Sequence, residues 1–355
     1  MCFANQGLPA QQDRFINRDP TSNSRLSASE LKRMRRYQKH KLFGFHNLRG
    51  LANGDDARLE ELFNKMQSRG YTAVALAEAG LGDAEIDRHG CKLLRPDQDT
   101  VVHVDHGSRL GVGILLNPAG ISAFKMGGAV KHVGYSSGRV MAVRLLFRDQ
   151  SGDDLGVHFV CAHAPTGMAA QAKWDLFFSD LSACCDKKRA RDVLVVAIDG
   201  NASIGTKSSG DWGEAKPCAG NHGLPYVNPS GERMRNYMLT RELFAVSTFF
   251  KKKRPRYATW WRPNPNFLEQ THGRKNRAFQ LDHFFMHGDD LQRVKDCGKA
   301  APWLASDHGA IKLLLKLKTK LTPKREPNQR TSAQPSRCWT VALYVARRAT
   351  AQRFG

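Results

Sequence analysis

The feature that most constrains this chain is a set of short polar motifs, each of which adjoins an apolar run. Asp199 and Asn201 directly follow residues 193–198, which read VLVVAI. Asp282 ends a second apolar stretch, and Asp307 and His308 stand just before a third, residues 310–315. Apolar runs of this length, bounded by turn residues, predict buried strands. Because strand ends deliver side chains to the edge of a sheet, we expect these residues to meet at one rim.

The residue types in these motifs favour phosphate chemistry. Side chains two positions apart leave a strand on the same side, so Asp199 and Asn201 are expected to share a pocket. Three aspartates, an amide and an imidazole suit metal-assisted hydrolysis of a phosphodiester. A single aspartate before a strand is more often a cap or turn residue, so the prediction depends on the whole set.

Three further motifs lie upstream: residues 45–51 (FHNLRGL), 75–78 (ALAE) and 162–166 (AHAPT). The order and spacing of all six resemble the endonuclease/exonuclease/phosphatase superfamily over about residues 45–317. This resemblance implies a deoxyribonuclease-I-like fold, which is a two-sheet α/β sandwich flanked by helices. Residues 111–116, 137–140, 247–253 and 257–260 look most like non-LTR retrotransposon-type endonuclease domains and their host-encoded, craniofacial-development-protein-like relatives.

The resemblance implies a site for a divalent metal. Glu78 matches the principal metal-binding glutamate of the family. Asn47 matches the asparagine that positions this glutamate or contacts metal and phosphate, and Asp307 would assist metal binding or the leaving oxygen. Hard oxygen ligands of this kind favour Mg²⁺ or Mn²⁺ as the cofactor.

The remaining matches imply catalytic roles. Asp199 matches the residue that orients or deprotonates the attacking water, and Asn201 matches the amide that steadies phosphoryl oxygens. His308 matches the histidine that stabilises the transition state, and Asp282 matches the acid that orients it. His163 occupies a position where many relatives carry a phosphate-contacting tyrosine.

Two departures from the family pattern bear on function. Arg49 stands where abasic-site endonucleases carry an acid, which argues against specialised abasic-site repair. Gly200 replaces a bulky residue and is expected to loosen the turn that aims Asn201. The sequence therefore predicts a metal-dependent endonuclease that nicks nucleic acid, with DNA as the expected substrate. The alternatives are a catalytically weak nucleic-acid-binding derivative and a phosphatase or lipid phosphodiesterase of the same superfamily.

Charge supports a polyanionic partner. The chain has 55 Lys and Arg against 33 Asp and Glu, a net charge of +22. We expect a basic, partly disordered extension over residues 1–44, one catalytic domain over 45–317 and a basic tail over 318–355. Such flanks can hold phosphate backbones without reading sequence, or they can be merely solvated or remnants of a longer reading frame.

A basic run in the expected domain, Lys251, Lys252, Lys253 and Arg254, is read as a loop that grips phosphates or as a nuclear import signal. Arg49 is a further expected contact to nucleic acid. Trp260 and Trp261 are expected to be packing residues rather than base-stacking platforms. His103 and His106 lie in a polar loop and are expected to face solvent.

Local patterns predict several elements. Residues 55–70 and 169–187 are expected to be helices, as is a segment near residues 231–243, and strands are expected at 71–76, 113–116, 140–147 and 157–162. The eight cysteines include no CxxC pair. No signal peptide or membrane-spanning run is recognisable, so we expect a soluble protein of a reducing, intracellular compartment, nuclear if it derives from a eukaryotic retroelement. The sequence does not indicate an oligomeric state.

Overall fold

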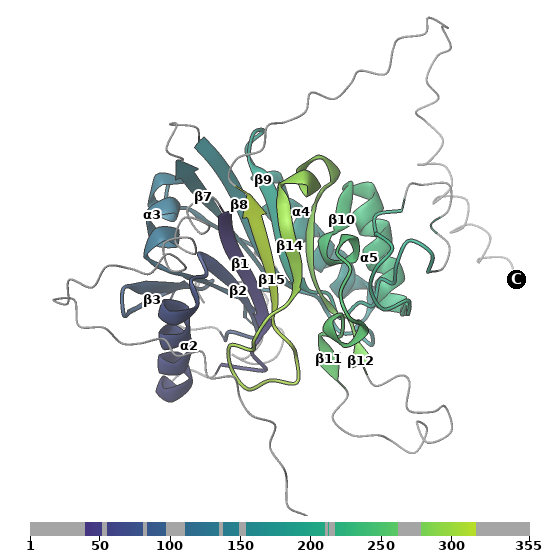
Figure 1. Ribbon diagram of the computed structural model, residues 1–355, viewed down its shortest axis with the longest axis horizontal. Helices are drawn as coiled ribbons and strands as arrows, with labels where there is room; N and C mark the ends of the chain where they lie inside the picture. Colours follow the sequence, from purple (N-terminus) through teal and green to yellow (C-terminus); the bar gives the residue numbers. More distant parts are fainter. Residues whose placement is uncertain are drawn as a thin grey trace, which may run out of the picture. The chain divides into compact units, whose positions relative to one another are not determined.

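Two β-sheets face each other across a shared core, with helices packed outside them (Figure 1). The computed structural model describes residues 40–51, 55–80, 84–96, 111–134, 138–148, 154–209, 212, 217–261 and 278–316. Within them, the seven-stranded sheet has the order β14-β15-β1-β2-β5-β4-β3, and the six-stranded sheet has the order β10-β13-β9-β8-β7-β6. The predicted two-sheet α/β sandwich is confirmed.

The element bounds follow the apolar runs of the sequence. The seven-stranded sheet contains β1 (His40–Asn47), β2 (Ala73–Ala77), β3 (Glu85–Arg88), β4 (Cys91–Leu94), β5 (Gly113–Leu116), β14 (Val294–Lys299) and β15 (Ile311–Lys316). The six-stranded sheet contains β6 (Lys131–Val133), β7 (Val140–Arg148), β8 (Asp154–His163), β9 (Val193–Asp199), β10 (Leu243–Ala245) and β13 (Asp282–His287). A separate pair is formed by β11 (Trp260–Trp261) and β12 (Ala278–Phe279). The helices are α2 (Asp56–Arg69), α3 (Pro118–Met126), α4 (Gln171–Asp186) and α5 (Pro229–Thr240), and the 3₁₀ helices are η2 (Val246–Phe249), η3 (Arg254–Arg256) and η5 (Gly288–Arg293).

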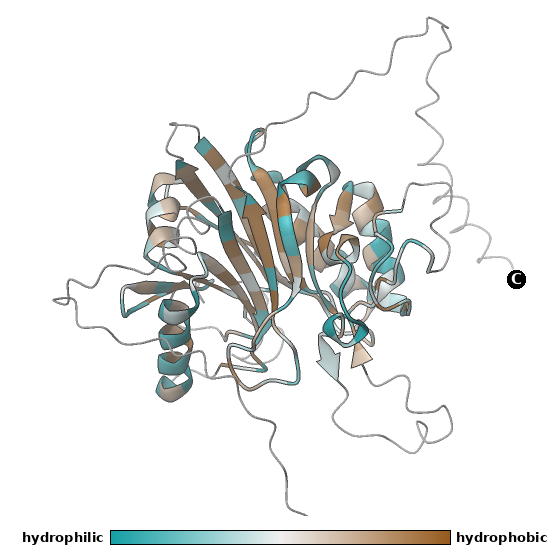
Figure 2. Ribbon diagram, viewed as in Figure 1, coloured by the Kyte–Doolittle hydropathy of each residue, from teal (hydrophilic) through white to brown (hydrophobic). Residues whose placement is uncertain are grey.

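Strand β9 shows why the sheets are covered on both faces. Its residues are all buried, and alternate side chains point to opposite faces of the sheet. Val193, Val195 and Ala197 pack in the core between the sheets. Leu194, Val196 and Ile198 pack outside with residues of α4 and α5. A continuous apolar run is therefore needed here, and Figure 2 shows the central strands as predominantly hydrophobic.

Helix α2 covers the outer face of the seven-stranded sheet. The side chain of Asp55 accepts a hydrogen bond from the Arg58 amide and caps the first turn. Gly70 ends the helix with φ of 69°, a left-handed conformation that glycine adopts without steric cost. Leu59, Leu62, Phe63 and Met66 pack in the outer cluster with residues of β2 and β4.

The strand directions bring the predicted motifs to one rim. β1 and β2 are parallel and so are β8 and β9, which aligns Asn47 with Ala77 and His163 with Asp199. The expectation that Asp282 ends a strand is wrong, because Asp282 begins β13. Since β13 runs antiparallel to β9, this start still lies opposite Asp199. Asp282 therefore lies at the predicted rim, but at the start of its strand and not at the end.

The third expected helix also differs from its prediction. Helix α5 begins at Pro229, because the Asn228 side chain accepts a hydrogen bond from the Gly231 amide and caps it. It ends at Thr240, and Leu243 belongs to β10. Strand β1 begins at His40, inside the segment expected to be an extension. His103, His106 and residues 1–39 and 317–355 lie outside the described residues.

Two general findings concern the described part of the chain. None of its helices combines the length and apolarity needed to cross a membrane. Its cysteines, Cys91, Cys161, Cys184, Cys185, Cys218 and Cys297, are all free and buried.

Candidate active site

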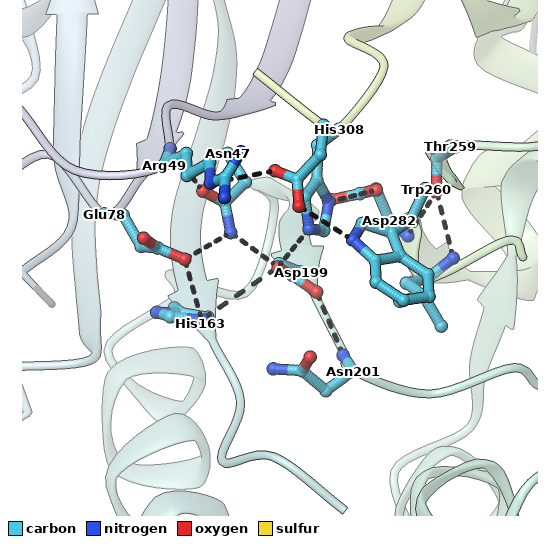
Figure 3. Close-up of polar contacts among 12 residues, drawn as sticks. Asn47, Arg49, Glu78, His163, Asp199, Asn201, Thr259, Trp260, Asp282 and His308 are labelled. Atoms are coloured by element: carbon cyan, nitrogen blue, oxygen red, sulfur yellow. Dashed lines mark hydrogen bonds and ion pairs between the residues drawn. The ribbon is translucent and has the colours of Figure 1, made fainter. Parts of the chain in front are cut away.

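The centre of the rim is a hydrogen-bond network around Asn47 at the end of β1 (Figure 3). Its amide Nδ2 donates to Glu78 Oε1 at 2.9 Å and to Asp199 Oδ2 at 2.8 Å. Its Oδ1 accepts the Arg49 amide at 2.8 Å, which fixes the orientation of the side-chain amide. Asn47 therefore joins the two sheets and holds two carboxylates at set positions.

Three non-glycine residues at this rim have left-handed backbone conformations. The φ angles are 56° at Arg49, 52° at Glu78 and 44° at Asn201. Such conformations cost energy in non-glycine residues and often mark functional sites. Here each one turns the chain sharply after a strand, so that the side chain is presented at the rim.

Asn201 lies in the turn after β9. Its amide donates to Asp199 Oδ1 at 3.0 Å, and its side-chain Nδ2 donates to the Ala164 carbonyl at 2.9 Å. One hydrogen of that Nδ2 is thus engaged in holding the turn. The preceding Gly200 donates its amide to the Leu281 carbonyl at 2.9 Å. The turn is tied down at three points.

His308 lies between two buried aspartates. Its Nδ1 is 3.0 Å from Asp282 Oδ2, and its Nε2 is 3.8 Å from Asp199 Oδ2. Asp282 is in turn held by Thr259, whose hydroxyl oxygen accepts the amides of Leu281 and Asp282 at 2.9 and 3.0 Å. The acid, the imidazole and the second acid form one connected line across the rim.

Electrostatics gives His308 a positive charge at neutral pH. Burial of the ring lowers its pKa, but the Asp282 and Asp199 carboxylates, together with the Asp282 hydrogen bond, outweigh this and raise the pKa to about 10. Burial raises the pKa of Glu78 above its usual range, and the hydrogen bond from Asn47 partly opposes that change. The site therefore combines a fixed cation with closely spaced acids.

His163, at the end of β8, faces the same carboxylates. Its Nε2 is 4.0 Å from Glu78 Oε1 and 4.0 Å from Asp199 Oδ2. The structure thus places all the predicted catalytic and metal residues on this rim, and Figure 3 labels all of them except Asp307.

Asp307 lies at the edge of the network. Its Oδ2 accepts a hydrogen bond from Trp260 Nε1 at 3.1 Å, and Arg49 Nε approaches its Oδ1 at 3.8 Å. Sequence reasoning treated Trp260 as a packing residue and did not single out Thr259, so both positions were missed. The prediction that Trp261 is a packing residue is wrong: it is 36% exposed, with Lys299 Nζ 3.9 Å from the centre of its ring.

The loop that carries Asp307 and His308 is held from behind. Ser306 Oγ donates to the Asn47 carbonyl at 2.8 Å and accepts the His308 amide at 3.1 Å. Two cations of α2 also bind the loop: Lys65 donates to the Trp303 carbonyl at 2.8 Å, and Arg69 donates to the Pro302 carbonyl at 2.8 Å. The loop is therefore anchored to both β1 and α2.

The basic run follows η2, outside this network. Lys252 forms an ion pair with Asp296 of β14. Lys251, Lys253 and Arg254 are exposed. Lys252 is therefore already engaged by an acid, whereas the other three present their charge to solvent.

Among the described residues, two groups of side chains offer ligands for a metal. Asp199, Asp282 and His308 place ligand atoms within 4.8 Å of one another, but these acids are 1% and 0% exposed and their charges are opposed by the His308 cation. Glu78 and Asp307 have side chains 24% and 21% exposed. The Glu78 and Asp307 carboxylates are therefore more open than these buried acids to an ion that keeps some of its water ligands.

Comparison with known proteins gives distant sequence relatives. No protein-family model matches the chain. Craniofacial development protein 2 of Bos taurus is 23% identical over 254 residues, covering 69% of this chain and 37% of that protein. The same protein of Tragulus javanicus is also 23% identical, with 38% of its length covered. The chain thus spans less than two fifths of the length of these relatives.

Solved structures share the architecture. An AP endonuclease, LMAP, from Leishmania major has a TM-score of 0.54 at 13% identity and covers 82% of this chain and 91% of its own. The 3′ phosphatase NExo from Neisseria, bound to a product DNA hairpin, has a TM-score of 0.51 at 14% identity and covers 77% and 98%. These likenesses confirm the fold that the sequence resemblance implies.

Proposed function

From the deoxyribonuclease-I-like fold of the endonuclease/exonuclease/phosphatase superfamily and the rim it carries, we propose that this protein is a divalent-metal-dependent phosphodiesterase that nicks DNA. The observation that carries the proposal is the fixed position of Asp199. This carboxylate is held by Asn47 Nδ2 at 2.8 Å, and the charged His308 ring lies 3.8 Å away. A carboxylate that can act as a base and a cation thus lie next to each other at the rim where a phosphate would react.

The donor set fits a hard divalent cation. Glu78 and Asp307 offer carboxylate oxygens, and Asn47 orients Glu78 rather than turning its own oxygen towards the site. Mg²⁺ and Mn²⁺ prefer such ligands. When bound, the cation would polarise the phosphate and offset its charge.

The residues of the chain supply the remaining steps. Asp199 accepts the proton of the attacking water, and the Asn201 and Asn47 hydrogen bonds keep its carboxylate aimed. His308, kept protonated by Asp282, donates a hydrogen bond to a phosphoryl oxygen and stabilises the charge that builds up there. In this proposal, the second hydrogen of Asn201 Nδ2 and the His163 ring contact the other phosphate oxygens.

Charge and aromatic rings support nucleic acid as the substrate. The chain carries a net charge of +22. A row of rings leads away from His308: Trp260 at 6.5 Å from it, Phe279 at 5.5 Å from Trp260, and the half-exposed Tyr226 at 5.7 Å from Phe279. Such faces can stack on bases, and we assign backbone contacts to Arg49, Lys251, Lys253 and Arg254. One of the similar structures is itself bound to DNA.

One reason for the alternative, a catalytically weak nucleic-acid-binding derivative, is the expectation that Gly200 loosens the turn that aims Asn201. The hydrogen bonds of Gly200 and Asn201 to Leu281, Asp199 and Ala164 hold this turn, which removes the reason to expect a loose one. The proposal also includes an origin from a retroelement, which the motif resemblance supports. It further includes action in the nucleus, which the exposed basic run supports.

The test is nicking of supercoiled plasmid with Mg²⁺ or Mn²⁺ and with a chelator. We expect metal-dependent nicking by the wild type and loss of at least about a hundredfold in Asp199→Asn and His308→Ala. Asp192→Asn is the matched control, because Asp192 is a buried carboxylate paired with Arg144 at the opposite end of β9. Cleavage of sphingomyelin or a phosphoinositide with intact DNA would overturn the proposed substrate. DNA binding that survives chelation, without cleavage across the metal series, would support the binding-protein alternative.

A further inference from the structure

His46 is a buried histidine on the opposite face of β1 from Asn47. It is the last residue but one of the strand, so its side chain points away from the carboxylates and into the outer layer. The residue is fully buried. Its Nε2 lies 3.1 Å from the carbonyl oxygen of His308, a residue 262 positions away.

The chemistry of this contact fixes the protonation of the ring. A carbonyl oxygen only accepts hydrogen bonds, so Nε2 of His46 must carry the hydrogen. The ring is fully buried, and burial favours its neutral form. The Nδ1 atom is then a bare acceptor, and it has no hydrogen-bond partner among the described residues.

The unsatisfied Nδ1 indicates why the histidine is present. A buried polar atom without a partner destabilises the folded protein, and an apolar side chain of similar size would avoid this cost. The surroundings are apolar in general, since Leu48, Trp303 and Leu304 pack in this outer layer. What the imidazole adds over such a side chain is the hydrogen bond to the His308 carbonyl.

We propose that His46 is a positioning residue for His308: its Nε2–H fixes the His308 backbone, so that the imidazole keeps its place between Asp282 and Asp199. This rests on the proposed function for its catalytic consequence. On one strand, His46 and Asn47 thus serve the same site from opposite faces, one through a backbone carbonyl and the other through side-chain carboxylates.

The same kind of contact away from the site provides a control. His158 of β8 is a buried strand histidine whose Nε2 lies 2.8 Å from the Cys184 carbonyl of α4, and its Nδ1 is likewise without a partner among the described residues. Replacing either ring with Phe removes one buried hydrogen bond at similar volume. Only the replacement at residue 46 should disturb His308.

The first experiment needs no activity. Amide hydrogen exchange of residues 306–309 is measured by NMR in metal-free wild type, His46→Phe, His46→Gln and His158→Phe. We expect exchange about tenfold faster in His46→Phe, close to wild-type rates in His158→Phe, and recovery in His46→Gln, whose amide supplies a donor again. Equal exchange in the two Phe variants would overturn the proposal.

The second experiment is kinetic. We expect His46→Phe to lower kcat about tenfold or more at nearly unchanged KM, with Gln restoring most of it. A loss confined to KM, or an equal loss in His158→Phe, would contradict the positioning role. An inactive wild type would refute the proposed function. The exchange data would still show whether the His46 hydrogen bond fixes the His308 backbone. If His46→Phe does not fold, the ¹⁵N chemical shifts of the His46 ring in the wild type at pH 7 test the proposal instead. A hydrogen on Nε2 and none on Nδ1 supports it, and the opposite tautomer overturns it.

Discussion

Replacing Asp282 with Asn tests the electrostatic logic of the site most directly. Asp282 is fully buried and lies 3.0 Å from His308 Nδ1, while Asp199 remains 3.8 Å from Nε2. The variant keeps the shape and removes one of the two charges that hold the His308 proton. Its effect is therefore expected on the pKa of His308 more than on the position of the ring.

The magnitude follows from the pKa itself. The His308 pKa is about 10 against an ordinary 6.5. That difference is equivalent to roughly 5 kcal/mol in favour of the charged ring. One carboxylate within hydrogen-bond distance accounts for about 1 to 3 pKa units. In Asp282→Asn we therefore expect a His308 pKa of about 8, with Asp199 supplying the remaining increase.

The assay is an NMR titration of the His308 ring in metal-free protein, with Asp192→Asn as the control for loss of a distant buried carboxylate. The control should leave the His308 pKa where it is in the wild type. A His308 pKa that stays near 10 in Asp282→Asn would refute the reasoning, because the charge of Asp282 would then have no part in it. In nicking assays the same variant should lose about 10² to 10⁴ in rate.

Three further predictions concern stability and binding. The pKa of His308 is higher in the folded protein than in the unfolded chain, so its charged ring stabilises the fold fully below about pH 6.5 and loses this effect as pH rises towards 10. The denaturation midpoint of metal-free protein should therefore fall across that pH range. A midpoint that does not change with pH would contradict this. Thr259→Val leaves two buried amides without their acceptor, so chemical denaturation should show a loss of about 1 to 3 kcal/mol, against little change in Thr240→Val on the exposed end of α5. Lys253→Ala should weaken DNA binding and reduce the salt dependence by about one phosphate contact in fluorescence anisotropy, and an unchanged slope would exclude Lys253 from the interface.

The fold could be predicted largely from strand runs and motif order. VLVVAI before Asp199 is apolar on both faces because both faces of β9 are covered, and that is visible in the sequence. The start of β13 could not be predicted, because whether Asp282 begins or ends a strand depends on its pairing with the antiparallel strand β9.

The residues of the candidate site could be predicted where their own side chains stand in a motif. They could not be predicted where their role depends on a hydrogen bond to a residue distant in the sequence. Asp199 and His308 stand in recognisable motifs. Thr259 acts through its hydroxyl on two backbone amides, and Trp260 acts through one indole hydrogen on Asp307, 47 residues away. Such contacts have no local period or composition. The Ser306 bond to the Asn47 carbonyl spans 259 residues and needs the folded chain to be seen.

The place of β15 in the sheet has a consequence for synthesis of the protein. β15 lies between β14 and β1, so the first strand of the described chain has its antiparallel partner in the last. Local pairs such as β7 with β8 can form early, but the neighbour of β1 and the loop carrying His308 arrive only when residue 316 has left the ribosome. During elongation the chain holds Asn47, Glu78 and Asp199 without the histidine that completes them. The proposed nuclease would therefore be inert towards nucleic acid until residues 308–316 have emerged and β15 has paired with β1.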